Sequence, residues 1–361
     1  MAGRGRCSDS DDGVSKRRLN MEGYTYYDVK KAPFSLHGFY DVYNTEGFVR
    51  VPADVAKATN PGVANHSRES AGGRIRFKTN SDSIVIKTKM LDRAYNFFNG
   101  APSMESGFAV YVDTPFNCSF AGCTNPAPDR RFEYESEIKL GSGEKEITVC
   151  MPLYGVVEEV FIGLKDGSSL SEHTPYTYTT PVVYYGSSIT QGAFSIRPGN
   201  DYENIISRRF DWDYINLGFA GSCKGEDAIV DYIASIDMSA FVLDYDHNAP
   251  NVDHLRATHY KAYEKVRAAH PDIPLYMVTR PAYQYLFDTM PRRAVIMESY
   301  LKAFNSGDKN VFFIDGLSFS VGTELNDFSP DRCHPDNYGL RKMAEVIGDT
   351  MAKTVDFKNL K

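Results

Sequence analysis

The chain has 361 residues, of which 42% are hydrophobic and 24% are charged, and these are the proportions of an ordinary globular protein. Its formal net charge of −7 argues against a nucleic-acid partner, because binding a polyanion requires a clustered basic surface. No stretch of about 18 uncharged apolar residues occurs, so the sequence predicts no membrane-spanning segment and no membrane partner.

Residues 1–20 mix charges of both signs with glycine and serine, and they lack the apolar core of a secretory signal. We interpret them as a disordered tail, and because Met21 follows directly, their place in the native protein stays open. Without an export signal, we expect the protein in the cytoplasm. The six cysteines include no CxxC pair; Cys118 and Cys123 could bridge a hairpin, but free thiols are the expectation.

Period-two alternation dominates residues 21–170, which we expect to form an antiparallel, jelly-roll-like β-sandwich domain without a helix of useful length. The turn residues at 80–82 predict a hairpin between the first two strands. The predicted strands are 74–79, 83–89, 108–113, 135–140, 146–151 and 157–164.

Short apolar runs alternate with longer amphipathic ones from residue 181, which is typical of βαβ units. The predicted strands are 181–185, 214–219, 240–245, 275–280 and 311–316, and the predicted helices are 201–210, 225–236, 252–270, 289–306 and 337–353. Residues 181–361 are therefore expected to form a three-layer α/β/α sandwich around a five-stranded parallel sheet. The polar segment 168–180 is the expected linker.

Functional groups collect at the carboxyl ends of the strands in an open parallel sheet, so the loops after each strand are the places to search. The first loop holds Ser187 and Ser188 between glycines, which fits either an exposed nucleophile or a capped turn. Thr190 stands where the GxSxG elbow of α/β-hydrolases requires glycine. Gly221 and Asn248, in the next two loops, could donate N–H groups to an oxyanion or serve as turn residues.

An aspartate three residues before a histidine can orient the imidazole as a general base, and this spacing occurs twice. Asp331 and His334 lie on a proline-bracketed loop, whereas Asp244 and His247 follow a predicted strand. Residues three apart in an extended strand point to opposite faces, but a loop imposes no such separation. We therefore expect Asp331 and His334 to form the functional pair.

These motifs, in this order at the ends of consecutive strands, resemble the SGNH (GDSL-type) hydrolase family over about residues 181–353. The β-rich first half followed by YGSSITQG is similar to the two-domain branch of that family, which includes carbohydrate esterases. The resemblance implies that Ser188 is the nucleophile, with His334 as its base and Asp331 as the orienting carboxylate. It also implies an oxyanion hole made by Ser188, Gly221 and Asn248.

The chain departs from the family pattern at Ser187 and Ala249, where aspartate is usual. The implied reaction is hydrolysis of an ester through an acyl-enzyme, without a metal or other cofactor. Polar loops at 195–203 and 326–332 favour a small substrate carrying a short acyl group, acetyl above all, on a carbohydrate or similar polar alcohol. Candidate substrate contacts are Glu226, Asp246, His247 and Arg280.

Two alternatives remain at this point. One is a lysophospholipase or thioesterase acting on longer acyl chains, which would need an apolar acyl groove. The other is a catalytically inactive protein that binds carbohydrate. The sequence leaves open the oligomeric state and the exact acyl group and alcohol.

Overall fold

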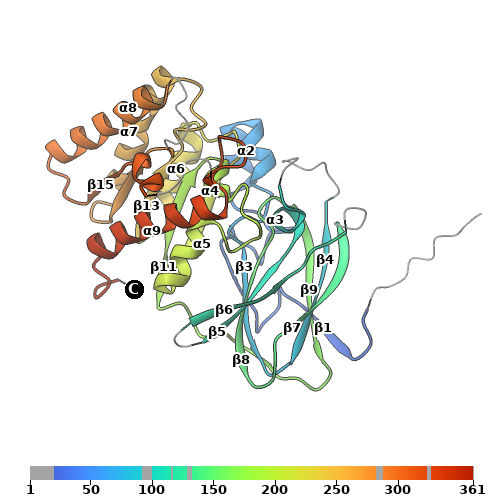
Figure 1. Ribbon diagram of the computed structural model, residues 1–361. Helices are drawn as coiled ribbons and strands as arrows, with labels where there is room; N and C mark the ends of the chain where they lie inside the picture. Colours follow the sequence, from blue (N-terminus) through green and yellow to red (C-terminus); the bar gives the residue numbers. More distant parts are fainter. Residues whose placement is uncertain are drawn as a thin grey trace, which may run out of the picture.

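The N-terminal half of the chain forms a β-sandwich, and the C-terminal half forms a layered α/β structure beside it (Figure 1). The computed structural model describes residues 20–91, 100–114, 117–127, 132–281, 288–322 and 327–360. The predicted tail therefore lies outside the described residues except for Asn20.

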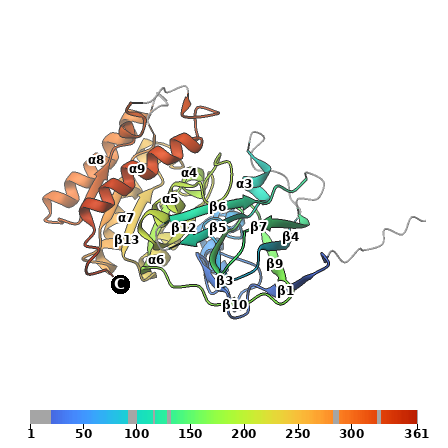
Figure 2. The same ribbon diagram turned by 60° about the horizontal axis from the view of Figure 1, so that its bottom comes forward.

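Two antiparallel sheets build the sandwich (Figure 2). Both turn apolar side chains toward one core. The first sheet has the strand order β1-β9-β4-β7, with β1 at Tyr24–Asp28, β9 at Val157–Lys165, β4 at Ser83–Met90 and β7 at Glu133–Lys139. We call the second sheet B. Its strand order is β10-β3-β8-β5-β6, and β2 at Ser35–His37 also pairs with β3. The bounds are Leu170–Ser171 for β10, Arg74–Thr79 for β3, Lys145–Cys150 for β8, Ala109–Thr114 for β5 and Asn117–Cys123 for β6.

The predicted hairpin between the first two long strands is wrong. Strand β3 pairs with β2, β8 and β10, whereas β4 pairs with β7 and β9, so the connection at 80–82 crosses from one sheet to the other. Ile75 on β3 and Ile84 on β4 meet in the same core from opposite sides. Burial of both apolar faces therefore decides the pairing rather than the short turn.

The C-terminal half contains a parallel sheet of five strands in the order β12-β11-β13-β14-β15, which confirms the predicted α/β/α architecture. The first of these strands in the chain, β11, is second in the order, with β12 on one side of it and β13, β14 and β15 following on the other. The bounds are Tyr178–Gly186 for β11, Trp212–Gly218 for β12, Ala240–Asp244 for β13, Leu275–Val278 for β14 and Val311–Ile314 for β15.

Helices cover both faces of this sheet, since alternate residues of each strand point to opposite sides. Val183 and Tyr185 face α6, α7 and α8, whereas Val182 and Tyr184 face α5, α9 and the 3₁₀ helix at Gly316–Ser320. The helices are α4 at Ser188–Gln191, α5 at Tyr202–Phe210, α6 at Asp227–Ser235, α7 at Val252–Ala269, α8 at Thr289–Asn305 and α9 at Asn337–Thr354.

Three short helices interrupt the N-terminal half, contrary to expectation: α1 at Ala53–Thr59, α2 at Pro61–His66 and α3 at Pro102–Ser106. Val51, Ala56 and Val63 lie in the core cluster that α6 and α7 form against the parallel sheet, and not in the sandwich core. The segment 51–66 thus precedes the sandwich strand β3 in the chain but packs with the C-terminal half.

No helix in the described part of the chain is long and apolar enough to cross a membrane. The cysteines at 118, 123, 150, 223 and 333 are free thiols, so Cys118 and Cys123, both on β6, form no bridge.

Candidate active site

Ser188 is placed by the sharp turn that connects β11 to the short helix α4. The strand ends at Gly186, where a Cβ atom would lie 1.9 Å from Thr190 Oγ1 and 2.5 Å from the carbonyl oxygen of Asp244. Ser187 is the N-cap of α4, and its Oγ accepts a hydrogen bond of 3.2 Å from the N–H of Ile189. Ser188 follows as the first helical residue and is 8% exposed.

His334 and Asp331 lie on the loop that leads into α9. The Asp331 carboxylate accepts hydrogen bonds from the backbone N–H of Cys333 at 2.8 Å and of His334 at 2.7 Å. Its other oxygen lies 2.7 Å from His334 Nδ1. Arg332, between them, has φ of 64°, in the left-handed region that few side chains other than glycine adopt. This tight turn brings the carboxylate back onto the imidazole.

The loop and the turn meet at a hydrogen bond of 2.8 Å between Ser188 Oγ and His334 Nε2. With the Nδ1 proton donated to Asp331, Nε2 is free of a proton and accepts the hydroxyl hydrogen of Ser188. The ring of Phe194 lies against the imidazole with 5.1 Å between ring centroids. Ser188, His334 and Asp331 therefore form one continuous chain of hydrogen bonds.

Asp331 is held in its ionised form by this geometry. Partial burial by itself would raise the pKa of its carboxyl group, but the hydrogen bonds from the backbone and ring of His334 and from the backbone of Cys333 lower the pKa overall. A carboxylate that stays charged fixes the tautomer of the imidazole and would stabilise an imidazolium.

Two further loops follow β12 and β13, the strands that flank β11 on either side. Gly221 has φ of 65°, and no atom lies within 4 Å of the position of a Cβ, so its backbone borders open space. Asn248 accepts a hydrogen bond of 3.3 Å at Oδ1 from the N–H of Cys223. This bond sets the orientation of the amide, so that Nδ2 is the end presented as a donor. An amide side chain and a glycine N–H held in this way can both serve an oxyanion.

The competing pair, Asp244 and His247, does not form. Asp244 is buried and accepts hydrogen bonds of 3.2 Å each from Thr190 Oγ1 and Tyr202 Oη. Burial, with smaller contributions from nearby positive charges that include Arg280, lowers the pKa of His247 to about 3. His247 therefore stays neutral at pH 7.

The other predicted substrate contacts are bonded within the protein. Glu226 Oε1 accepts from Asn60 Nδ2 at 2.6 Å, and its Oε2 accepts from the Lys224 N–H at 3.1 Å. Asp246 is 1% exposed and accepts from the N–H of Arg280 at 3.2 Å, and burial raises its pKa to about 6 despite the nearby guanidinium of Arg280.

Arg280 is itself buried, and it donates to Thr289 Oγ1 at 2.9 Å and to Asp288. Both carboxylate oxygens of Glu226 are thus bonded, whereas Asp246 Oδ1 and Arg280 Nε have no partner in the described part of the chain, and contact of these three residues with substrate stays a prediction.

Sequence reasoning missed the side chains that join the nucleophile turn to the rest of the chain. Gln191, fully buried in α4, accepts from the Ala220 N–H at 2.9 Å and donates to the Leu153 carbonyl oxygen at 3.1 Å and to Glu69. Tyr154 donates to the carbonyl oxygen of Ser188 at 3.2 Å. Glu69, Leu153 and Tyr154 come from the N-terminal half, and no local pattern marks contacts over such distances in the chain.

Comparison with protein families agrees with this architecture. Residues 179–352 match the GDSL-like lipase/acylhydrolase family, and residues 24–170 match the N-terminus of SGNH-hydrolase-type esterases. The chain therefore belongs to the SGNH (GDSL-type) hydrolase family, in the branch with an N-terminal β-sandwich. The family expected from the sequence motifs is confirmed, and with it the general class of ester hydrolase.

Several solved structures are similar over most of the chain. A protein described as a GDSL-like lipase, from Bacteroides ovatus, is 26% identical, with a TM-score of 0.82 over 94% of this chain and 99% of its own. The salicylyl-acyltransferase SsfX3 from a tetracycline biosynthetic pathway is 18% identical, with a TM-score of 0.74 over 92% of this chain and 98% of its own.

A family two carbohydrate esterase from Clostridium thermocellum, in complex with cellohexaose, is 13% identical, with a TM-score of 0.58 over 80% of this chain and 94% of its own. This structure and that of SsfX3 share the fold. A search of curated proteins gave no match.

Proposed function

We propose that the protein is a serine esterase that removes short acyl groups, acetyl above all, from hydroxyls of a carbohydrate or similar polar compound. The observation that carries the proposal is the hydrogen-bonded chain from Ser188 Oγ through the His334 imidazole to the Asp331 carboxylate. A nucleophile joined to a base, with the base joined to an orienting carboxylate, is the arrangement that acyl transfer to serine requires.

The reaction follows from the positions of the protons. His334 Nε2 removes the proton of Ser188 as Oγ attacks the ester carbonyl carbon, and Asp331 stabilises the imidazolium. The oxyanion accepts hydrogen bonds from the N–H groups of Ser188 and Gly221 and from Asn248 Nδ2. The tetrahedral intermediate collapses when the imidazolium returns the proton to the leaving alkoxide. Water, deprotonated by His334, then attacks the acyl-enzyme and releases the carboxylic acid and free Ser188.

The substrate class rests on the chemistry of the loops and on the related structures. The segment after α4 is polar and is tied down by hydrogen bonds, with the Ile196 N–H donating to Asn337 Oδ1 at 2.8 Å. A long acyl chain would need an apolar groove to receive each methylene group. Carbohydrate esterases are among the proteins of similar fold, and one of them was solved with cellohexaose. These observations support a short acyl group on a sugar.

Labelling with a fluorophosphonate tests the nucleophile. We expect the probe to modify Ser188 and Ser188→Ala to abolish both labelling and hydrolysis of p-nitrophenyl acetate, because the Ser188 hydroxyl is hydrogen-bonded to His334 Nε2. The matched control is Ser187→Ala, which removes only a cap bond and should keep most of the activity at a stability cost of about 1 kcal/mol. Mass spectrometry that places the adduct on Ser187 would refute the assignment.

The acyl-chain profile tests the substrate. We expect kcat/KM to fall from p-nitrophenyl acetate to octanoate, and acetylated cello-oligosaccharides to release acetate. A profile that rises with chain length would favour the lysophospholipase or thioesterase alternative. Binding of the sugar without any turnover would favour the inactive binding protein.

A further inference from the structure

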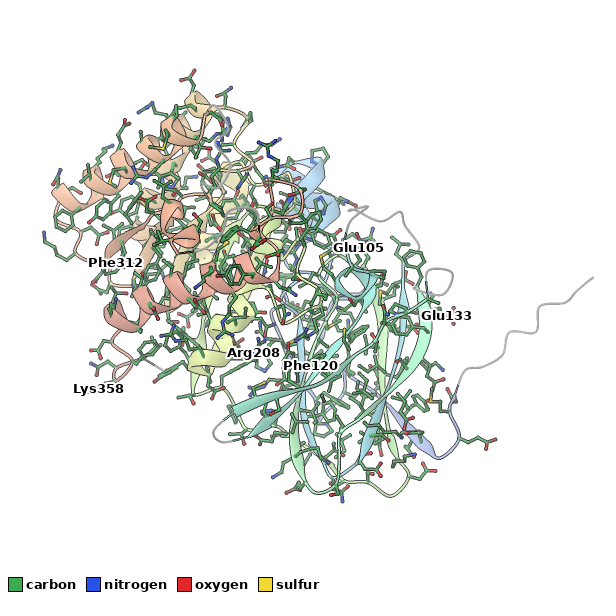
Figure 3. All side chains as sticks on the ribbon, in the orientation of Figure 1. Glu105, Phe120, Glu133, Arg208, Phe312 and Lys358 are labelled. Carbon is green, nitrogen blue, oxygen red and sulfur yellow. The ribbon has the colours of Figure 1, made fainter. Side chains whose placement is uncertain are left out.

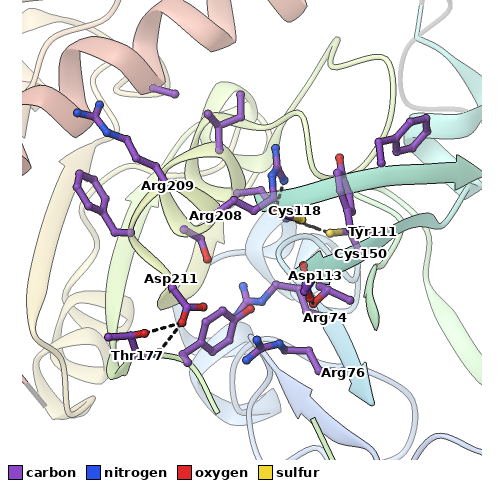
Figure 4. Close-up of a pocket in the computed structure, with 18 of the residues that line it drawn as sticks. Arg74, Arg76, Tyr111, Asp113, Cys118, Cys150, Thr177, Arg208, Arg209 and Asp211 are labelled. Carbon is purple, nitrogen blue, oxygen red and sulfur yellow. Dashed lines mark hydrogen bonds between the residues drawn. The ribbon is translucent and has the colours of Figure 1, made fainter. Parts of the chain in front are cut away.

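A large cleft lies between the outer face of sheet B and helix α5, away from the candidate active site. It has a volume of about 1280 Å³, and Ser188, His334 and Asp331 do not line it. Strands β3, β5, β6 and β8 form one wall, and α5, the N-terminal part of α9 and the segment 173–177 form the other (Figure 4). Figure 3 shows Phe120 of the sandwich and Arg208 of α5, which face this cleft from its two walls.

The polar wall follows from the alternation along the strands of sheet B. On β3, Ile75 and Phe77 point into the sandwich core, so Arg74 and Arg76 point outward to the cleft. The neighbouring strands repeat the pattern, with apolar residues inside and polar or aromatic residues on the cleft side. Arginines on the solvated outer face of a sheet are normally exposed. Arg74 and Arg76 are instead buried, at 1% and 4% exposure.

The carboxylates of the cleft already have partners within the chain. Each of them accepts a hydrogen bond from a hydroxyl, a backbone N–H or a histidine, or forms an ion pair with an arginine. These acidic residues are Asp113, Glu146, Asp211, Glu345 and Asp349. None of these contacts joins a carboxylate to Arg76, Arg197 or Arg208.

Three arginines of the cleft pair with no carboxylate in the described ranges, and each lies over an aromatic ring. The distances from the guanidinium carbon to the ring centroid are 3.7 Å for Arg76 over Tyr176, 3.8 Å for Arg197 over Phe120 and 4.6 Å for Arg208 over Tyr111. A ring covers a face of the guanidinium plane and leaves the N–H groups in that plane able to bind a planar or tetrahedral oxyanion. Arg208 uses one of these groups within the chain, since its Nη1 donates to Asn204 Oδ1 at 2.7 Å.

Arg76 gives the strongest sign of a missing partner. Its Nε and Nη1 atoms are buried, and neither has a hydrogen-bond partner among the residues that the structure describes. Nearby Arg74 also has a buried Nε without a partner in the part of the chain that the structure describes, but its Nη atoms pair with Asp213 at 2.5 Å and donate to the carbonyl oxygens of Gly72 and Tyr214. A buried cation with unused donors is unfavourable, and an anionic ligand would satisfy it.

We propose that this cleft binds a polar ligand carrying at least one carboxylate or phosphate group, which Arg76 holds with help from Arg197 and Arg208. The cleft exceeds the roughly 300–1000 Å³ of common small-molecule sites, which fits a ligand of oligosaccharide or sugar-phosphate size. The proposal is independent of the esterase function, because the two sites share no residue.

Calorimetric titration of the full chain tests the proposal with two acidic probes, trigalacturonate and fructose 1,6-bisphosphate, and with neutral cellotriose. We expect saturable binding of at least one acidic probe, and we expect that cellotriose does not displace the bound probe. The probe that binds more tightly identifies whether the cleft prefers carboxylate or phosphate. Arg76→Gln should weaken this binding by at least about tenfold, because it removes a charge-assisted donor from a buried site. Ser188→Ala should bind as the wild type does.

The matched control is Arg209→Gln, which removes an exposed cleft arginine that is already paired with Asp349 at 2.7 Å and should change the affinity less than twofold. Folding of each variant is checked by circular dichroism, and Arg208→Gln replaces Arg76→Gln if the latter does not fold. Failure of both acidic probes to bind, or equal loss of affinity in Arg209→Gln and in the test variant, would overturn the proposal.

Discussion

Ser187 explains how the chain can depart from the family's usual GDS segment and still build the same turn. Aspartate and serine are both good helix N-caps, and Ser187 Oγ receives the Ile189 N–H as an aspartate would. What the exchange removes is a negative charge one residue from Ser188. The backbone of the turn is therefore kept while its electrostatics change.

Asn248 should contribute to turnover rather than to stability. We expect Asn248→Ala to lower kcat by a factor on the order of 10²–10³ with little change in KM, because one oxyanion donor is lost. The control is Asn251→Ala, which removes the N-cap of α7 three residues away and should cost about 1 kcal/mol of stability without affecting kcat. Steady-state kinetics on p-nitrophenyl acetate would measure both, and a loss below about threefold in Asn248→Ala would make Asn248 a turn residue only.

His259 should make folding stability depend on pH. It is 1% exposed, neither ring nitrogen has a partner in the described part of the chain, and burial lowers its pKa to about 3 from 6.5. Between these values the unfolded chain binds a proton that the folded chain does not, so the free energy of unfolding falls as the pH falls, by up to about 1.4 kcal/mol per pH unit.

The test is urea unfolding of the wild type and His259→Phe from pH 7 to pH 4. Other buried groups titrate in both proteins, so the difference between the two isolates this histidine. We expect the variant to gain stability relative to the wild type as the pH falls. A constant difference would show that His259 is protonated in the folded protein.

Secondary structure elements were predictable where a periodic pattern extends over enough residues. All five strands of the parallel sheet and the helices α5 to α9 lie close to the predicted ranges, because each buries an apolar face. Helices α1 to α3 have seven residues or fewer, too short for a helical period to appear. Strand β6, NCSFAGC, lacks the β-branched residues that mark a strand.

The residues of the candidate site also fall into two groups, those that a local sequence pattern predicts and those that it does not. Ser188, Gly221 and Asn248 were predicted from short motifs that follow strands, and Asp331 and His334 from their spacing on the loop before α9. The residues that hold them, Gln191 and Glu69 above all, act through tertiary contacts that no local spacing encodes.

Helix α4 should depend on Gln191 for its position. Gln191→Leu keeps an apolar body of similar size but leaves the Ala220 N–H and the Leu153 carbonyl oxygen without their partner. We expect kcat to fall on the order of tenfold with KM nearly unchanged, because the turn of Ser188 and the loop of Gly221 lose their common anchor. Circular dichroism confirms folding, and an unchanged kcat would show that the other contacts of α4 suffice.

At the scale of the whole molecule, residues of the N-terminal half contribute to the core of the C-terminal half. Arg50 donates hydrogen bonds to the carbonyl oxygens of Asn216 at 3.0 Å and Gly218 at 2.7 Å, and Val63 is fully buried beside the parallel sheet. The stability of the C-terminal half should therefore depend on residues that lie between the sandwich strands β2 and β3 in the chain.

Val63→Ala tests this dependence. Loss of buried methyl groups should lower the free energy of unfolding by about 1–2 kcal/mol, and esterase activity should disappear at a correspondingly lower urea concentration. Val321→Ala is the control, because Val321 is 74% exposed and its truncation should change nothing. If the sandwich unfolded at a lower urea concentration while activity persisted, Val63 would belong to the sandwich core and the prediction would be wrong.

The packing of segment 51–66 on the parallel sheet also has a consequence for synthesis on the ribosome. Helices α1 and α2 leave the exit tunnel well before the strands and helices that cover them, which begin at about residue 182. The apolar side chains of Val51 and Val63 therefore stay without their packing partners until more than 100 further residues are translated. Contacts so distant in sequence form slowly, so we expect the nascent N-terminal half to need protection by a chaperone during this interval.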